Sequence, residues 1–154
     1  MIEEERRILE SIEAYGWYGV HIFDPELETP NFTYTVGFSQ TLNAPEFIVF
    51  GLHRDVMFDM LDSVFRQIKA GRKLKENQAW KGLYEDISCV ARNVAHVEAF
   101  SQYAVMADWF WKRGGNKGHP GLVQLVWPDW LTGAYPWEDG CRDSVREAQP
   151  QLWS

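Results

Sequence analysis

Two acidic residues stand at points where a strand is expected to meet a loop. Glu46 opens one apolar run of the sequence, and Asp129 follows another. Two carboxyl groups that share an aromatic pocket can have well-separated pKa values, so that one acts as an acid and the other as a base. Carboxylates also accept hydrogen bonds from backbone N–H groups where strands meet loops. We favour this capping interpretation and keep acid–base chemistry as the alternative.

Sequence patterns of other catalytic sites are incomplete. Residues 127–129 (Trp-Pro-Asp) match the acid loop of tyrosine phosphatases, which also need a cysteine followed six residues later by an arginine. The residues six positions after Cys89 and Cys141 are an alanine and a glutamate. The glycine-rich run 114–118 lacks the Gly-Lys-Ser/Thr order of a P-loop. The sequence therefore predicts no phosphoryl-transfer chemistry.

Metal-binding residues are scattered along the chain. The four histidines are His21, His53, His96 and His119, and no two of them are three to five residues apart. Neither cysteine has a neighbour at the spacing of a metal ligand. We expect no metal and no organic cofactor. Cys89 is predicted to be a small core residue rather than half of a redox pair with Cys141.

Hydrophobic periodicity predicts the elements that must position these residues. The expected helices are 2–15, 55–69 and one that begins at Ser101, and the expected strands are 17–23, 32–38, 46–52, 87–98 and 121–127. Residues 72–85 read as a charged connection. Short links between the first three strands predict an antiparallel or mixed sheet of about five strands, with helices packed on one side. The fold class is therefore α+β, in a single domain spanning residues 1–154.

The tryptophans gather late in the sequence. Six of the eight follow residue 100: Trp109, Trp111, Trp127, Trp130, Trp137 and Trp153. Trp109 and Trp111 are two residues apart on one expected helix, so they cannot both face the core. Residues 128–154 lack a regular pattern, but leaving a large ring in water forfeits about 1.5–3 kcal/mol. We therefore expect this irregular tail to fold back across the body, with Trp127 and Trp137 near the ends of the second and third strands.

The overall charge limits the partners. With 15 Lys and Arg against 22 Asp and Glu, the formal net charge is −7. Nucleic acids and anionic membranes require a basic patch, so neither is expected as a partner. No apolar run approaches the ~20 residues of a membrane span. The N-terminus lacks the apolar core of a signal peptide, which predicts a cytoplasmic location.

Several short motifs share their order and spacing with one bacterial family. They are Gly16-Trp17, Tyr34-Thr35-Val36-Gly37, Pro45-Glu46, Gln124 followed by Trp127-Pro128-Asp129, and Pro136-Trp137-Glu138. Over residues 16–153 the chain resembles the family called domain of unknown function 4262. The resemblance implies a cytoplasmic, single-domain protein of bacterial or phage origin and carries no catalytic residues.

The chain departs from the family pattern at two positions. Ala44 stands where the pattern often has a histidine, and His53 stands where it commonly has a proline. If the histidine has a catalytic role in relatives, this chain has lost that role or uses His53 instead.

The motif positions suggest one candidate binding site, at one end of the sheet. Its residues are Tyr34, Thr35, Glu46, Gln124, Trp127, Asp129, Trp137 and Glu138. We expect a non-enzymatic, immunity- or inhibitor-like module that binds a basic protein surface, with a second copy of the chain as another partner to consider. The alternative is a small hydrolase or ligand-binding protein that uses Glu46 and Asp129 in an aromatic pocket.

Overall fold

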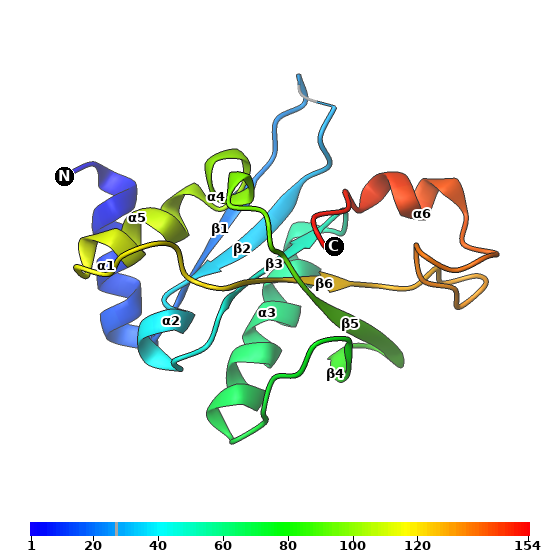
Figure 1. The fold of residues 1–154 in the computed structure, drawn as a ribbon, viewed down its shortest axis with the longest axis horizontal. Helices are drawn as coiled ribbons and strands as arrows, with labels where there is room; N and C mark the ends of the chain where they lie inside the picture. The colour runs from blue at the N-terminus through cyan, green and yellow to red at the C-terminus, as the bar shows by residue number, and fades with distance from the viewer. Residues whose placement is uncertain (27) are drawn as a thin grey trace.

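A six-stranded mixed sheet forms the centre of the computed structural model, which describes residues 1–26 and 28–154 (Figure 1). The strands are β1 (Tyr18–Ile22), β2 (Phe32–Val36), β3 (Glu46–Phe50), β4 (Gln78–Tyr84), β5 (Ile87–Asn93) and β6 (Leu122–Val126). The helices are α1 (Glu3–Tyr15), α2 (Phe38–Thr41), α3 (Arg54–Lys69), α4 (Glu98–Gln102), α5 (Val105–Arg113) and α6 (Asp143–Ala148). The α+β class is confirmed, with one strand more than expected.

The order of the strands decides which loops are neighbours. The sheet runs β1-β2-β3-β6-β5-β4, and all adjacent pairs are antiparallel except β3 and β6. In this parallel pair Glu46 lies opposite Leu122. The first residues of β3 and β6 therefore share one end of the sheet, and the chain leaves both strands at the other end.

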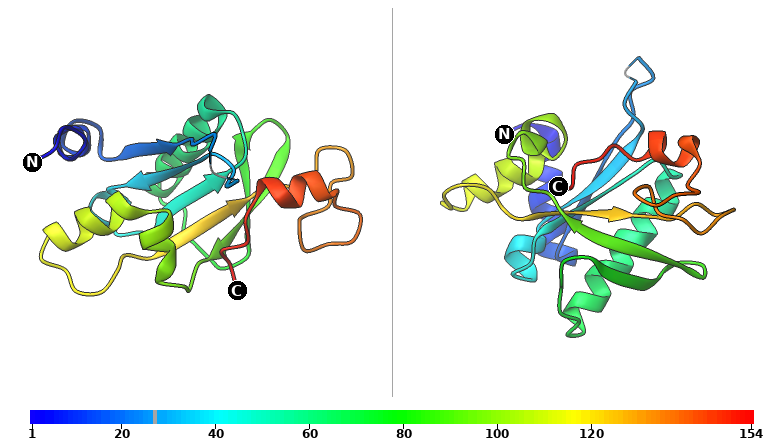
Figure 2. Two further views of the ribbon diagram at one scale, coloured as in Figure 1. Left: turned by 90° about the horizontal axis from the view of Figure 1, so that it is seen from above. Right: turned by 45° about the vertical axis from the view of Figure 1, so that its right-hand side comes forward.

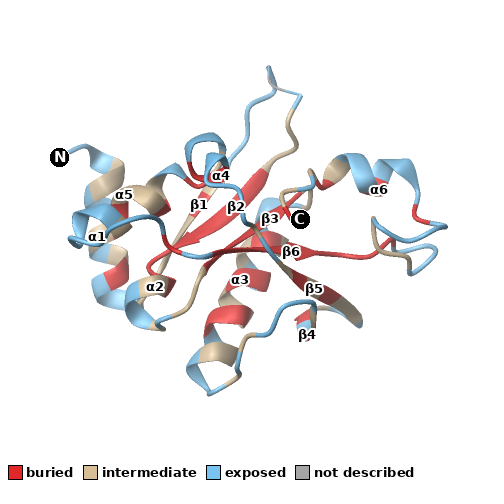
Figure 3. Cartoon of the chain, viewed as in Figure 1, coloured by how far each residue is buried: buried red, intermediate tan, exposed pale blue. Residues whose placement is uncertain are grey.

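Helices cover both faces of the sheet, so the expectation of helices on one side is wrong. Phe47 and Val49 of β3 join a core cluster with α3, whereas Ile48 and Phe50 join a second cluster with α1, α4 and α5. Figure 2 shows α3 (cyan-green) and α5 (yellow-green) on opposite sides of the strands. The physical reason is that β2, β3 and β6 are buried along their whole length, as Figure 3 shows, and apolar side chains on both faces need cover.

Strand β4 lies within the segment that was expected to be a charged connection. Its two buried side chains, Trp80 and Leu83, are three residues apart instead of two or four. The pairing register with β5 shifts between Trp80 and Tyr84, and Gly82 there has a φ of +79°. This β-bulge turns both side chains inward and removes the two-residue alternation by which a strand is recognised in a sequence.

Other element boundaries also differ from the expected ones. The strand expected over 87–98 ends at Asn93, and the helix expected to begin at Ser101 is two short helices, α4 and α5. The α1 and α3 helices are confirmed within a residue or two. Among the described residues no helix is long and apolar enough to span a membrane.

The tail after β6 packs against the body, as expected. It leaves the sheet as a loop, forms the short helix α6 and returns toward the middle strands (Figure 2). The tail passes close to the backbone at Gly51, the residue that follows β3. A Cβ atom on Gly51 would collide with the carbonyl oxygen of Ala148.

Candidate functional site

The carboxylate of Glu46 is fully buried and accepts four hydrogen bonds. Oε1 accepts from the Thr35 hydroxyl at 2.7 Å and from the Phe38 N–H at 3.0 Å. Oε2 accepts from the N–H groups of Gly37 at 3.0 Å and Ser39 at 3.3 Å. Each oxygen is therefore occupied by two donors, as the capping interpretation predicts, and the carboxylate fixes the start of α2.

The local sequence makes this cap necessary. Gly37 has a φ of +113°, a left-handed conformation that favours glycine, and a Cβ there would lie 2.9 Å from Ile12. This turn aims three consecutive N–H groups at Glu46. Burial raises the pKa of Glu46 to about 7, and the hydrogen bonds from Thr35 and the three N–H groups oppose that rise.

Tyr34, next to Thr35 on β2, points to the other face of the sheet. Its hydroxyl accepts a hydrogen bond from the N–H of Met106 at 3.0 Å, in the first turn of α5. Burial raises the pKa of Tyr34 well above its ordinary value. Tyr34 therefore holds α5 on the sheet.

Gln124 and Trp127 bind the returning tail. The Gln124 side chain donates to the Pro150 carbonyl at 2.9 Å and accepts from the Leu152 N–H at 3.1 Å. The Gln149 side chain accepts a hydrogen bond from the Trp127 N–H at 3.0 Å and donates one to the Trp127 carbonyl at 2.9 Å. The Trp127 indole donates to the Phe50 carbonyl at 2.8 Å, which confirms its expected place at the end of β3.

Asp129 is buried and ion-paired with Arg142. The guanidinium lies 2.7 Å from Oδ1, and the Arg142 N–H donates to Oδ2 at 2.9 Å. The N–H groups of Leu131 and Thr132 also donate to Oδ1, at 2.8 and 3.3 Å. The Arg142 guanidinium holds the pKa of Asp129 well below its usual range. Asp129 therefore organises a loop and is not free at a rim, where it was expected.

Trp137 and Glu138 lie on a different part of the tail. The guanidinium of Arg92 lies 4.6 Å from the centre of the Trp137 ring, and the Trp153 ring packs edge-on against Trp137 at 5.7 Å. Glu138 is exposed, and its Oε1 accepts from the Tyr135 N–H at 2.9 Å. Trp137 thus packs over β5 and not near the ends of β2 and β3.

The eight predicted site residues do not converge, so the expectation of one shared site is wrong. Thr35 and Glu46 lie at the end where β3 and β6 begin, whereas Trp127 and Asp129 follow β6 at the opposite end. Five residues of strand separate the two ends by about 16 Å. Glu46 and Asp129 therefore cannot act together as an acid–base pair.

Comparison with family models identifies residues 11–142 as Domain of unknown function (DUF4262). The chain belongs to this family. The match confirms the resemblance, although it begins before residue 16 and ends before residue 153. No curated protein and no solved structure matches the chain significantly.

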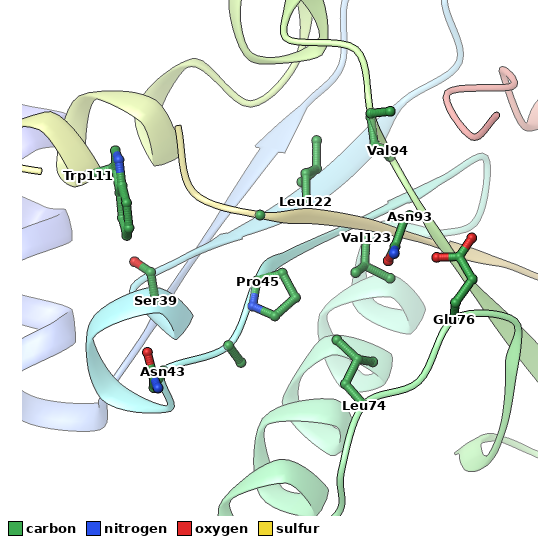
Figure 4. A pocket seen from close by; sticks show the side chains of 13 residues that line it. Ser39, Asn43, Pro45, Leu74, Glu76, Asn93, Val94, Trp111, Leu122 and Val123 are labelled. Atoms are coloured by element: carbon green, nitrogen blue, oxygen red, sulfur yellow. The ribbon is translucent and has the colours of Figure 1, made fainter. Parts of the chain in front are cut away.

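Ala44 and His53, the two positions at which we expected the chain to depart from the family pattern, lie at opposite ends of β3. Ala44 lines a cavity of about 650 Å³. Its neighbour Pro45, which also lines this cavity, is labelled in Figure 4. His53 directly precedes α3, where its Nδ1 accepts the N–H of Asp55 at 3.1 Å. His53 therefore cannot take the place of a histidine at position 44.

The tail carries an exposed apolar tip, at two residues that the sequence did not single out. Trp130 is 43% exposed and Leu131 76% exposed, on a turn closed by hydrogen bonds of 2.8 Å between Asp129 and both Gly133 and Ala134. Trp130 also packs against Trp127, with ring centres 4.9 Å apart. We call Trp130 and Leu131 the tail tip. The one feature of the sequence that pointed to the tail tip was the high number of tryptophans after residue 100.

The β4–β5 hairpin lies beside the tail tip. Tyr84, at the end of β4, packs edge-on against Trp130 with ring centres 6.0 Å apart. The next two residues, Glu85 and Asp86, are exposed. In this DUF4262 protein the β4–β5 turn, which begins directly after the Tyr84 that contacts the tail tip, therefore carries two acidic residues.

Proposed function

We propose that this DUF4262 protein is a non-enzymatic module that binds a basic protein surface through the tail tip. The observation that carries the proposal is the rigid exposure of Trp130 and Leu131 next to the acidic turn at Glu85 and Asp86. Tryptophan is enriched among the residues that dominate binding energies at interfaces.

Rigidity of the tip favours binding. Asp129 accepts hydrogen bonds from three backbone N–H groups and from the Arg142 side chain, so the turn that carries Trp130 is already ordered before a partner arrives. A pre-ordered loop loses less conformational entropy on association than a flexible one. The ion pair between the buried Asp129 and the half-exposed Arg142 therefore supports binding by ordering the loop, with no catalytic role.

The negative net charge of the chain favours a basic partner. The chain carries a formal net charge of −7, so two copies repel each other, whereas a basic surface is attracted. This favours a different, basic protein over a second copy. We place the interaction in the cytoplasm of a bacterial or phage-infected cell, in keeping with the unpaired thiols of Cys89 and Cys141.

Photo-crosslinking tests the proposal directly. A photoreactive amino acid at position 131 should crosslink the partner in a host-cell lysate, and the same amino acid at Phe23, which is 68% exposed elsewhere, serves as the control. The expected result is a product specific to position 131 that contains a basic protein and disappears in the Trp130→Ser variant.

Three outcomes contradict the proposal. They are identical products from positions 131 and 23, a crosslinked partner that is acidic, and a crosslinked dimer of this chain. The dimer would make a second copy the partner and would shift the sedimentation coefficient of the pure protein.

A further inference from the structure

Two hollows adjoin each other at the Glu46 end of the sheet, opposite the tail tip. One has a volume of about 650 Å³ and the other about 290 Å³, and both are lined by Ser39, Asn43 and Trp111. Volumes in this range are typical of small-molecule sites. Trp109, by contrast, packs against the core, as expected for two tryptophans two residues apart on one helix.

Trp111 is held in place by the loop that follows its helix. Its indole N–H donates to the Lys117 carbonyl at 3.0 Å, and the Asn116 side chain donates to the Trp111 carbonyl at 3.0 Å. The end of this loop is tied to α5 by the 2.6 Å contact between His119 and Asp108. In Figure 4 the ring is seen nearly edge-on, so that one face is turned toward the cavity. The loop thus presents a fixed aromatic surface.

Apart from one carboxylate, the polar side chains that line the cavity are amides and a hydroxyl. Among the described residues, the side chains of Ser39, Asn43 and Asn93 have no hydrogen-bond partner, although Ser39 is fixed through its backbone by Glu46. An amide offers both donors and an acceptor, and a hydroxyl offers both as well. These groups suit a ligand whose own polar groups are hydroxyls.

The cavity lacks a counter-charge for an anion. Within the described part of the chain, none of the residues that line either hollow is Lys, Arg or His, and the one charged side chain is the carboxylate of Glu76. Phosphorylated and carboxylated ligands would therefore bind without a charged partner. The floor, Leu122 and Val123, is apolar.

We propose that this cavity binds a neutral saccharide of one or two rings. The C–H face of a sugar ring stacks on Trp111, while hydroxyls at the ring edge bind Ser39 and Asn43. Asn93 and Glu76 lie across the cavity from Trp111 (Figure 4), where they face the hydroxyls of a second sugar ring.

Titration of the whole protein with defined sugars tests this assignment. Glucose, N-acetylglucosamine, maltose and cellobiose are added in turn, with adenosine as the competing class, and binding is followed by calorimetry and saturation-transfer NMR. We expect saturable binding of a disaccharide. Trp111→Leu should weaken it about tenfold or more, and Trp130→Leu, the same change at the tail tip, should leave it unaltered.

Asn93→Ala provides a second variant whose folding is not at risk. Asn93 is exposed at the end of β5, so its loss should weaken the disaccharide several-fold without changing the melting temperature. The proposal is overturned if no sugar binds saturably, if adenosine binds more tightly than every sugar, or if the two cavity variants bind as well as the wild type. These results leave the tail-tip function untouched, because the two sites lie at opposite ends of the sheet.

Discussion

Glu46 is a buried carboxylate whose four lone-pair positions all face donors. In Glu46→Gln one oxygen becomes an NH₂ group that faces N–H groups and cannot accept from them. We expect the free energy of unfolding to fall by about 1–3 kcal/mol, as for other buried groups left without a partner. Urea denaturation above pH 7, where Glu46 is ionised, measures this loss, with Glu13→Gln on the exposed face of α1 as the matched control.

The raised pKa of Glu46 also predicts a pH dependence. Burial raises this pKa from 4.5 to about 7, so the folded chain holds the proton more tightly than the unfolded chain between these values. The contribution of Glu46 to stability is then complete below pH 4.5 and is lost as the pH rises toward 7. Thermal melts across this range should show the slope in the wild type and a weaker one in Glu46→Gln. An equal dependence of the melting temperature on pH in the wild type and in Glu46→Gln would contradict the raised pKa of Glu46.

At the scale of the elements, the Asp129–Arg142 pair orders the loop that carries the tail tip. Arg142→Ala leaves the buried carboxylate without its cation, and the loop should open. We expect faster chymotrypsin cleavage after Trp130 and Leu131 in the folded protein. Arg7→Ala on α1 is the control, and an unchanged cleavage rate in Arg142→Ala would show that the turn is ordered without the ion pair.

Gln149 joins the tail to β6. Its side chain is buried, and its two hydrogen bonds to the Trp127 backbone are lost in Gln149→Ala. The expected cost is about 1–3 kcal/mol of unfolding free energy, measured by urea denaturation. Gln151→Ala, an exposed position two residues later, should change little. If Gln149→Ala were as stable as Gln151→Ala, the Gln149 side chain would not hold the tail on β6.

For the molecule as a whole, the net charge of −7 predicts how a partner associates. Attraction between the acidic protein and a basic surface is screened by salt. Raising the ionic strength from about 0.05 M to about 0.5 M should therefore slow association more than it speeds dissociation. Surface plasmon resonance with the crosslinked partner measures both rates, and a salt-independent association rate would contradict electrostatic recognition.

Several features of this protein could be read from local sequence. The stripe Met57, Met60, Leu61 and Val64 predicts α3, and the fold confirms that it faces the core. The capping role of Glu46 was also predictable, because carboxylates at strand ends commonly bind backbone N–H groups. Family membership followed from motifs spread over most of the chain.

Other features depended on contacts between distant segments. The bulge at Gly82 concealed β4 because two buried residues three apart match no simple period. The parallel register of β3 and β6 placed Glu46 and Asp129 at opposite ends of the sheet. Both carboxylates nevertheless accept hydrogen bonds from backbone N–H groups where a strand meets a loop. Tertiary structure also decided that Trp127 is enclosed and Trp130 exposed.

The sequence by itself determined the composition of the chain, its charge, its family and most of its helices and strands, since each of these depends on single residues or on neighbours within a few positions. Only the tertiary structure decided which side chains meet. Pairing of strands and enclosure of the tail depend on how apolar surface from distant segments is removed from water, and that burial is a property of the whole chain.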